Sequence, residues 1–216
     1  MSITFYYGAG SPFTWRVWLA LEHKGLSYEL KTLSFSAGDT RKPDFIKINP
    51  RHHVPVIVDD GFVLYESAAI IEYLEDQYPA KSRERALFPA DIRERATVRR
   101  LIREIDQYFA FGVQRITGQL LRKPEAEWDI NKLAAGAELC VTELAYFEQE
   151  MRGEFLAGKL SAADFTLYPL LALVLRLEKK RPNLGVGAAV GESIASWARR
   201  IEALPYFKTT YPAHWK

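Results

Sequence analysis

Polar side chains that could do chemistry stand where two predicted strands give way to predicted helices. Ser11 follows the apolar strand pattern of residues 3–7 and precedes Pro12, which suits the first turn of a helix. Glu66 and Ser67 stand in the same way before a second predicted helix. A hydroxyl group and the free amide groups of a helix N-terminus can together donate hydrogen bonds to an anion or a thiolate. Serine is also a favoured helix cap, so the pattern alone leaves capping and ligand binding both open.

The residue spacing does not support other kinds of catalytic centre. Gly8 and Gly10 begin a dinucleotide-binding pattern, but Phe13 stands where its third glycine is required. The single cysteine, Cys140, excludes a disulfide within the chain and a cysteine-based zinc cluster. No metal-ligand spacing occurs among the four histidines, which are His23, His52, His53 and His214. The sequence therefore predicts no metal site, and it contains no Gly-x-Ser-x-Gly elbow of a hydrolase.

The first 78 residues alternate strand and helix patterns in the order βαβαββα. Period-two alternation marks the strands, and apolar residues at helical spacing mark the helices. Asp60-Gly61 joins two apolar runs and is a strong signal for a two-residue turn between antiparallel strands. The strands are predicted at residues 3–7, 27–33 and twice within 54–65, and the helices from Pro12 to Gly25, near 42–48 and after Ser67. This order predicts an α/β domain over residues 1–78.

Residues 91–216 are predicted to be almost wholly helical. A polar, proline-bounded stretch at 79–90 separates them from the first domain and is typical of a linker. The apolar spacing predicts helices over about 92–121, 130–151 and 159–179. The last of these has no polar face, which indicates a central helix, and its start from Ser161 to Asp164 resembles a capping box. The predicted fold class is therefore α/β plus all-α, in two domains.

The composition is that of an ordinary globular protein of 216 residues. Lys and Arg number 29 against 27 Asp and Glu, so the net charge of +2 argues against a nucleic-acid-binding surface. The longest apolar run, residues 167–175, is far shorter than the roughly 20 residues that span a bilayer. The opening residues lack the pattern of a secretory signal. We therefore expect a cytoplasmic protein that binds neither nucleic acid nor a membrane.

Four segments taken together resemble the cytosolic glutathione transferases. They are Ser-Pro-Phe-Thr-Trp-Arg-Val (11–17), Asn-Pro-Arg-His-His-Val-Pro-Val (49–56), Tyr-Glu-Ser-Ala-Ala-Ile (65–70) and Leu-Ser-Ala-Ala-Asp-Phe (160–165). The resemblance implies a thioredoxin-like N-terminal domain followed by an all-helical C-terminal domain. Ser-Pro-Phe is similar to the serine-type tau class of plants, Ser-x-x-x-Trp-Arg-Val to the zeta class, and the length is of the bacterial type. The beta class carries a cysteine where Ser11 stands, a place that Cys140 cannot take.

The resemblance also implies how the thiol of glutathione would be activated. Ser11 would donate its hydroxyl to the glutathione sulfur. The alpha, mu and pi classes use a tyrosine at the end of the first strand instead, which leaves Tyr6 and Tyr7 as rivals. Val54 would pair through its backbone with the cysteinyl unit of glutathione, beside a cis peptide bond at Pro55.

The two ends of glutathione would be held by other residues. The resemblance implies that Glu66 and Ser67 hold the γ-glutamyl amino and carboxylate groups. His53 would contact the glycyl carboxylate, although a neutral imidazole supplies one donor and little charge. Lowering a thiol pKa of about 8.5 by about two units requires about 2.7 kcal/mol. One hydrogen bond to a charged acceptor contributes about 1.5 to 3 kcal/mol and a helix end about 0.3 to 1, so Ser11 and its helix suffice.

The function implied is a detoxification enzyme that takes glutathione as co-substrate and adds it to a small apolar electrophile. Aromatic residues between the domains would contact that electrophile, namely Phe13, Phe35, Tyr108 and Phe111. Glutathione-dependent disulfide reduction, peroxide reduction and isomerisation are alternatives on the same fold. A non-catalytic ligand-binding or assembly module is an alternative of another class.

The resemblance further implies a homodimer in which the first domain of one subunit faces the helical domain of the other. The helix from about Ile92 is rich in arginine, which suits a charged seam, although pairing with Glu94 and Glu104 on the same helix would also explain these side chains. Asp106 on this helix would reach across the seam to the γ-glutamyl ammonium group, as an acidic residue does in some relatives.

Overall fold

The computed structural model describes residues 2–80 and 82–215, which form two compact units. The first unit runs as far as Phe88 and also contains the chain from Pro205 onward, and the second comprises Pro89–Leu204. The first unit contains a mixed sheet with helices, and the second unit contains helices. This confirms the predicted α/β plus all-α fold class. The sequence analysis assigned all residues from 91 onward to the helical domain. In the structure the last segment packs in the first unit, because its aromatic rings surround Trp15 there.

The sheet of the first unit has the strand order β2-β1-β3-β4. Its strands are β1 (Ile3–Gly8), β2 (Tyr28–Leu33), β3 (Val56–Asp59) and β4 (Phe62–Tyr65). The central strand β1 pairs parallel with β2 and antiparallel with β3, with Phe5 opposite Leu30 and Ile57. The predicted hairpin joins β3 to β4 through Asp60 and Gly61, whose φ angles of 46° and 90° are those that a tight hairpin turn requires.

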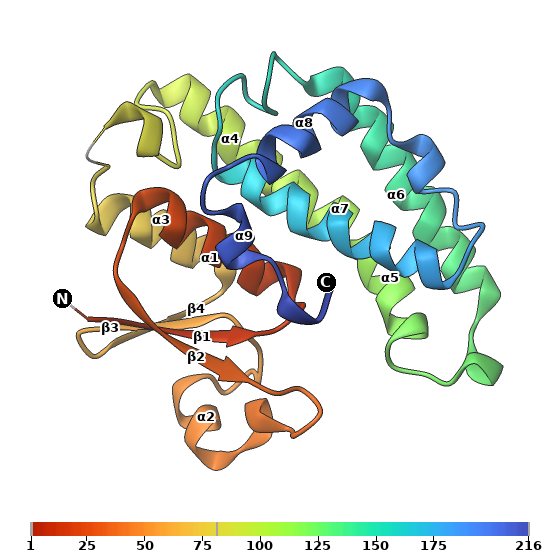
Figure 1. Cartoon of the computed structure of the whole chain (residues 1–216), viewed down its shortest axis with the longest axis horizontal. Coiled ribbons are helices and arrows are strands. Elements are labelled where there is room, and N and C mark those ends of the chain that lie inside the picture. The colour runs from red at the N-terminus through yellow and green to blue at the C-terminus, as the bar shows by residue number, and fades with distance from the viewer. Residues whose placement is uncertain (1, 81, 216) are drawn as a thin grey trace. The chain divides into compact units, whose positions relative to one another are not determined.

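Helices cover both faces of this sheet. Figure 1 shows α1 (Pro12–Lys24) and α3 (Ser67–Gln77) on one face and α2 (Pro43–Ile48) on the other. Successive side chains of a strand point to opposite faces. Accordingly Tyr7 packs against Trp18 of α1, with ring centroids 4.7 Å apart, whereas Tyr6 packs against Phe45 of α2 at 6.0 Å.

Two polar contacts fix α1 and α3 side by side. Lys24 near the end of α1 pairs with Glu75 near the end of α3 at 2.6 Å, and the two side chains are only 1% and 9% exposed. Arg16 near the start of α1 donates to the hydroxyl of Ser67, the first residue of α3. The two helices therefore run parallel, and their N-termini lie at the same end of the first unit.

The second unit is built around α7 (Ala162–Lys180), whose residues are mostly buried, as its all-apolar sequence predicts. The other helices of this unit are α4 (Ile92–Glu104), α5 (Ala110–Leu120), α6 (Ile130–Glu150) and α8 (Glu192–Glu202). The single long helix expected over about 92–121 is α4 and α5 joined by a π-helical segment at Ile105–Phe109. The segment contains Asp106 and Tyr108, so it changes which way these side chains face relative to a regular helix.

The predicted capping box begins α7. Asp164 accepts hydrogen bonds from the Ser161 N–H at 2.8 Å and the Ser161 hydroxyl at 3.0 Å. It also accepts from the Leu156 N–H at 2.9 Å and the Trp197 indole at 2.8 Å. Burial nevertheless raises the pKa of Asp164 to about 6, because desolvation of the carboxylate outweighs these four donors. The cap is a fully buried polar centre that ties three parts of the second unit together.

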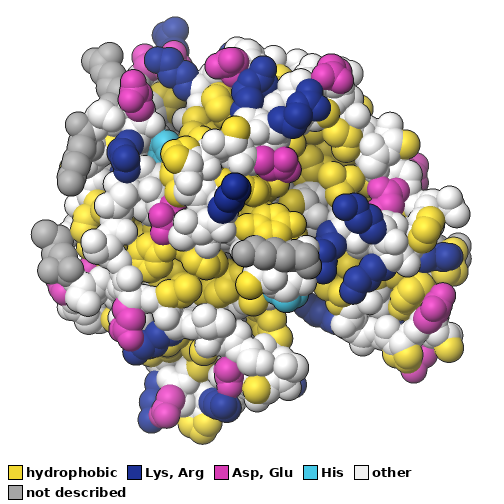
Figure 2. Space-filling view, viewed as in Figure 1, with side chains coloured by type: hydrophobic (Ala, Val, Ile, Leu, Met, Phe, Trp, Pro, Cys, Tyr) yellow, Lys and Arg dark blue, Asp and Glu magenta, His cyan; other side chains and the backbone are white. Residues whose placement is uncertain are grey.

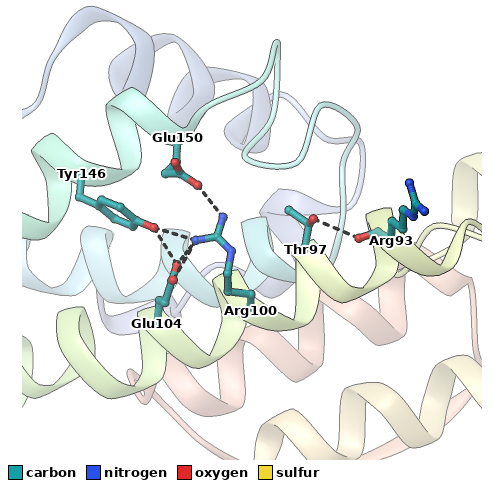
Figure 3. Close-up of polar contacts among 6 residues, drawn as sticks. All are labelled: Arg93, Thr97, Arg100, Glu104, Tyr146 and Glu150. Atoms are coloured by element: carbon teal, nitrogen blue, oxygen red, sulfur yellow. Dashed lines mark hydrogen bonds and ion pairs between the residues drawn. The ribbon is translucent and has the colours of Figure 1, made fainter.

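One arginine of the predicted seam is engaged within its own unit. Arg100 of α4 pairs with Glu104 on the same helix at 2.8 Å and with Glu150 of α6 at 2.5 Å, and it also donates to the Tyr146 hydroxyl (Figure 3). Acidic and basic side chains are interspersed on the face shown in Figure 2, in keeping with the small net charge. Within residues 2–80 and 82–215, no helix combines the length and apolarity needed to cross a bilayer.

Candidate active site

Ser11 occupies the turn between β1 and α1. Its side chain caps α1 by accepting a hydrogen bond from the Thr14 N–H, but the 3.4 Å separation is long for such a bond. The Ser11 N–H donates to the Gly8 carbonyl at 3.1 Å, and the Thr14 hydroxyl donates to the same carbonyl at 3.0 Å. A hydroxyl that accepts from Thr14 can still donate its own proton. Capping and thiol activation are therefore compatible at this residue.

Gly8 is the point at which three segments of the first unit meet. A Cβ atom built on Gly8 would lie 2.8 Å from Val54 Cγ2 and 2.5 Å from Phe35 Cζ, so both side chains rest on the Gly8 backbone. Ser11 is bound to the carbonyl of the same residue. The structure thus brings Ser11, Val54 and Phe35 to one corner of the unit, and the Phe35 ring is 53% exposed there.

Val54 lies just before β3, and its peptide bond to Pro55 is cis, as the resemblance implies. The pairing of β3 with β1 ends at Val56, so the Val54 backbone lies outside this ladder. Asn49, which is 1% exposed, donates through Nδ2 to the His53 carbonyl at 2.7 Å and so stabilises the loop that leads to Val54. The His53 side chain is exposed, as a contact to a ligand carboxylate would require.

Glu66 and Ser67 open α3 in an unusual backbone conformation. Glu66 has φ 71° and ψ 106°, a region that residues with a side chain rarely adopt. The Glu66 side chain is exposed and makes no cap hydrogen bond, so helix capping does not explain this residue. Ser67 is 5% exposed and accepts the hydrogen bond from Arg16.

The sequence analysis assigned no role to Arg16. Its side chain is 4% exposed, and a buried guanidinium next to the N-terminus of α3 adds positive charge where the helix dipole is already positive. The available signal was an arginine within an otherwise apolar helical face, because charged residues are almost never fully buried unless they have a partner.

The rival tyrosines lie in different surroundings. Tyr7 is 4% exposed, and burial raises the pKa of its phenol, which a hydrogen bond with the Gly10 backbone partly opposes. Tyr6 is half-buried on the α2 face, where the Lys31 ammonium lies 5.8 Å from its ring centroid. Of the three hydroxyl-bearing residues, only Ser11 combines a position at a helix N-terminus with partial exposure.

The other aromatic candidates belong to two units. Phe13 follows Ser11 in α1, and the Arg16 guanidinium lies 5.4 Å from its ring centroid. Tyr108 and Phe111 belong to the second unit and are 46% and 47% exposed, and the Arg115 guanidinium lies over the Phe111 ring at 4.7 Å. These exposed rings are available for contact with an apolar molecule.

Cys140 belongs to α6 of the second unit and is buried there. Burial raises the pKa of the Cys140 thiol to about 12, so it stays protonated and unreactive. In the part of the chain that the structure describes, no three His, Cys, Asp or Glu side chains gather as a metal-binding group.

A β2-β1-β3-β4 sheet with a cis-proline before β3, joined to an all-helical unit, defines a thioredoxin-like protein with a helical second domain. Residues 10–77 match the family model described as glutathione S-transferase, N-terminal domain. Over its whole length the chain is similar to glutathione S-transferase A of Pleuronectes platessa, with 30% identity across 99% of this chain and 92% of the relative. The chain belongs to the glutathione S-transferase family, and it is an enzyme of that family.

Solved structures agree with this assignment. A glutathione S-transferase from the Antarctic clam Laternula elliptica is 28% identical and covers 100% of this chain and 94% of its own, with a TM-score of 0.82. A glutathione transferase homologue from Sulfitobacter, solved with bound glutathione, has the same fold at 21% identity, a TM-score of 0.78 and 96% coverage of both chains.

Proposed function

We propose that this chain is a serine-type glutathione transferase with tau-like and zeta-like features that activates glutathione as a thiolate for attack on a small apolar electrophile. The observation that carries the proposal is the meeting of the Ser11 turn, the Val54 side chain and the exposed Phe35 ring at Gly8. In this arrangement the Ser11 turn supplies the hydroxyl donor. The residue just before β3, Val54, is proposed to offer its backbone, which lies outside the β1–β3 ladder, to the cysteinyl unit.

The chemistry at Ser11 is stabilisation of a negative sulfur. The Ser11 hydroxyl donates to the thiolate, and the N-terminus of α1 adds its positive dipole. Together they contribute roughly 2 to 4 kcal/mol, enough to lower a thiol pKa of about 8.5 toward neutrality. The thiolate is itself the nucleophile, so the mechanism requires no general base.

The γ-glutamyl end of glutathione is proposed to bind at the N-terminus of α3. The Ser67 hydroxyl, the first amides of α3 and the Arg16 charge all favour a carboxylate at that point. Glu66, whose side chain is exposed and free of cap bonds, is proposed to hold the γ-glutamyl ammonium group. His53 is proposed to meet the glycyl carboxylate at the other end.

Several finer points belong to the same proposal. The exposed ring of Phe35, together with Phe13, is proposed to contact the electrophile. The protein is proposed to act in the cytoplasm, in detoxification, as a homodimer to whose seam Asp106 contributes. Sedimentation equilibrium tests the dimer, because a single species near 24.7 kDa would contradict it.

The decisive test is the substitution Ser11→Ala, with Ser36→Ala as a matched control. Ser36 is an exposed serine of the same unit whose hydroxyl pairs with Ser34. Ser11→Ala removes one donor to a charged acceptor, so we expect turnover to fall at least about tenfold. The ultraviolet absorbance of the bound thiolate, followed against pH, should move to higher pH.

The outcomes separate the alternatives. Ser36→Ala should behave like the wild type in both measurements. A wild-type titration in Ser11→Ala, together with a shifted one in Tyr6→Phe or Tyr7→Phe, would transfer the role to a tyrosine. A panel of electrophiles, disulfides, peroxides and isomerisable substrates separates conjugation from the other glutathione-dependent reactions, and no turnover of any of them would favour the non-catalytic module.

A further inference from the structure

Residues 205–215, here called the C-terminal segment, belong to the first unit although they follow the whole of the second in the sequence. Figure 1 shows α9 (Phe207–Thr210) of this segment beside α1. The Trp15 indole of α1, 1% exposed, donates to the Thr210 hydroxyl at 3.0 Å. Three aromatic rings of the segment surround it at centroid distances of 5.9 Å for Phe207, 5.7 Å for Tyr211 and 5.5 Å for Trp215. The segment is thus anchored on the first turns of α1.

The end of the segment lies directly against the turn that carries Ser11. Gly10, the residue before Ser11, has φ 82°, a left-handed conformation that favours glycine. A Cβ atom built on Gly10 would lie 2.9 Å from His214 Nε2 and 3.3 Å from Trp215 Nε1. The imidazole and the indole therefore occupy the space beside the Gly10 backbone where the Cβ of any other residue would lie.

This contact bears on the direction of the Ser11 hydroxyl. Ser11 is bound on one side to Gly8 and on the other to Trp15, whose N–H donates to the Ser11 carbonyl at 3.0 Å. Gly10 lies between these two anchors in a left-handed conformation, and its backbone also makes the hydrogen bond with the Tyr7 phenol. A displacement of about 1 Å at a reacting group can reduce a rate by up to about a hundredfold. Whatever holds Gly10 in place therefore holds the donor in place.

We propose that His214 is a positioning residue for thiol activation, because its imidazole fixes the Gly10 backbone and thereby the Ser11 hydroxyl. This assignment rests on the proposed role of Ser11. Trp215 is 8% exposed and packs on Trp15, so it is part of the core. The His214 side chain is exposed and approaches the turn through Nε2. Its replacement therefore removes little buried apolar surface and should leave the fold intact.

The experiment compares His214→Gln and His214→Leu, two side chains of similar bulk of which only Gln keeps a polar nitrogen to stand in for His214 Nε2 beside Gly10. Lys208→Ala, an exposed change within the same segment, is the control. Each variant is titrated for thiolate formation with bound glutathione, and its kcat and KM for glutathione are measured. We expect His214→Leu to move the thiolate titration upward by about one pH unit and to lower kcat about tenfold, with KM changed less than about twofold. His214→Gln should recover most of both losses.

The results distinguish this inference from the proposed function. A His214→Leu protein that forms the thiolate and turns over like the wild type overturns the positioning role while leaving the role of Ser11 in place. A wild-type protein that forms no thiolate with glutathione overturns the proposed function, and the role of His214 with it. Equal losses in His214→Gln, His214→Leu and Lys208→Ala, with matching falls in melting temperature, indicate a structural effect alone and likewise overturn the positioning role.

Discussion

His23 of α1 should make the first unit sensitive to acid. The side chain is 6% exposed, and its Nδ1 lies 2.7 Å from the hydroxyl of Tyr206 in the C-terminal segment. Burial is the main cause that lowers the pKa of His23 to about 4, and the positive charges of Arg85 and Lys24 add to it. The folded protein therefore keeps a neutral imidazole at a pH where the unfolded chain already binds a proton.

The sign and size of the effect follow from the two pKa values. The folded pKa lies below the ordinary value of 6.5, so the stability contributed by His23 is fully present above pH 6.5 and is lost as pH falls toward 4. The difference between these values corresponds to about 3 kcal/mol of unfolding free energy. That is a substantial part of the 5 to 15 kcal/mol typical of a folded protein.

The assay is the free energy of unfolding in urea between pH 4 and pH 7 for the wild type and His23→Gln. Glutamine keeps a hydrogen-bonding group for Tyr206 but does not titrate. The wild type should lose about 3 kcal/mol more than the variant as the pH falls from 7 to 4. His53→Gln, which removes an exposed histidine, should follow the wild type. A constant difference between wild type and His23→Gln across this range would refute the reasoning.

Two further predictions concern other residues. The pKa of Asp164 is raised to about 6 from 3.8, so its contribution to stability is full below pH 3.8 and falls by about 3 kcal/mol as pH rises to 6, opposite in sign to His23. In urea unfolding, the free energy of unfolding of the wild type minus that of Asp164→Asn should fall over this pH window, and a wild-type advantage that grows with pH would contradict the prediction. Glu66→Gly should be about 1 kcal/mol more stable than Glu66→Ala, because glycine adopts φ 71° without strain, and equal melting temperatures of the two variants would show that the conformation stores no strain. Both variants should raise KM for glutathione more than they lower kcat, and an unchanged KM in both would remove Glu66 from the site.

Several elements of the fold could be predicted because their signals are local. Pro12 begins α1, Asp60-Gly61 forms the hairpin turn, and Ser161 with Asp164 caps α7, as their residue types indicate. Each of these features depends on residues within a few positions of one another. The π-helical segment at Ile105–Phe109 was not predicted, since the apolar spacing continues through it and indicates one regular helix.

The sequence by itself determined the order of strands and helices, the change from an α/β to an all-helical pattern and the residues that stand at helix N-termini. Their physical basis is the periodicity of 2 or 3.6 residues and the chemistry of turns and caps, which act between near neighbours. Only the tertiary structure decided that Arg16 meets Ser67, that Phe35 and Val54 rest on Gly8, and that His214 lies on Gly10. These contacts join residues from about 27 to more than 200 positions apart. Which distant side chains meet is decided by how the helices and strands pack, and no local pattern in the chain records that packing.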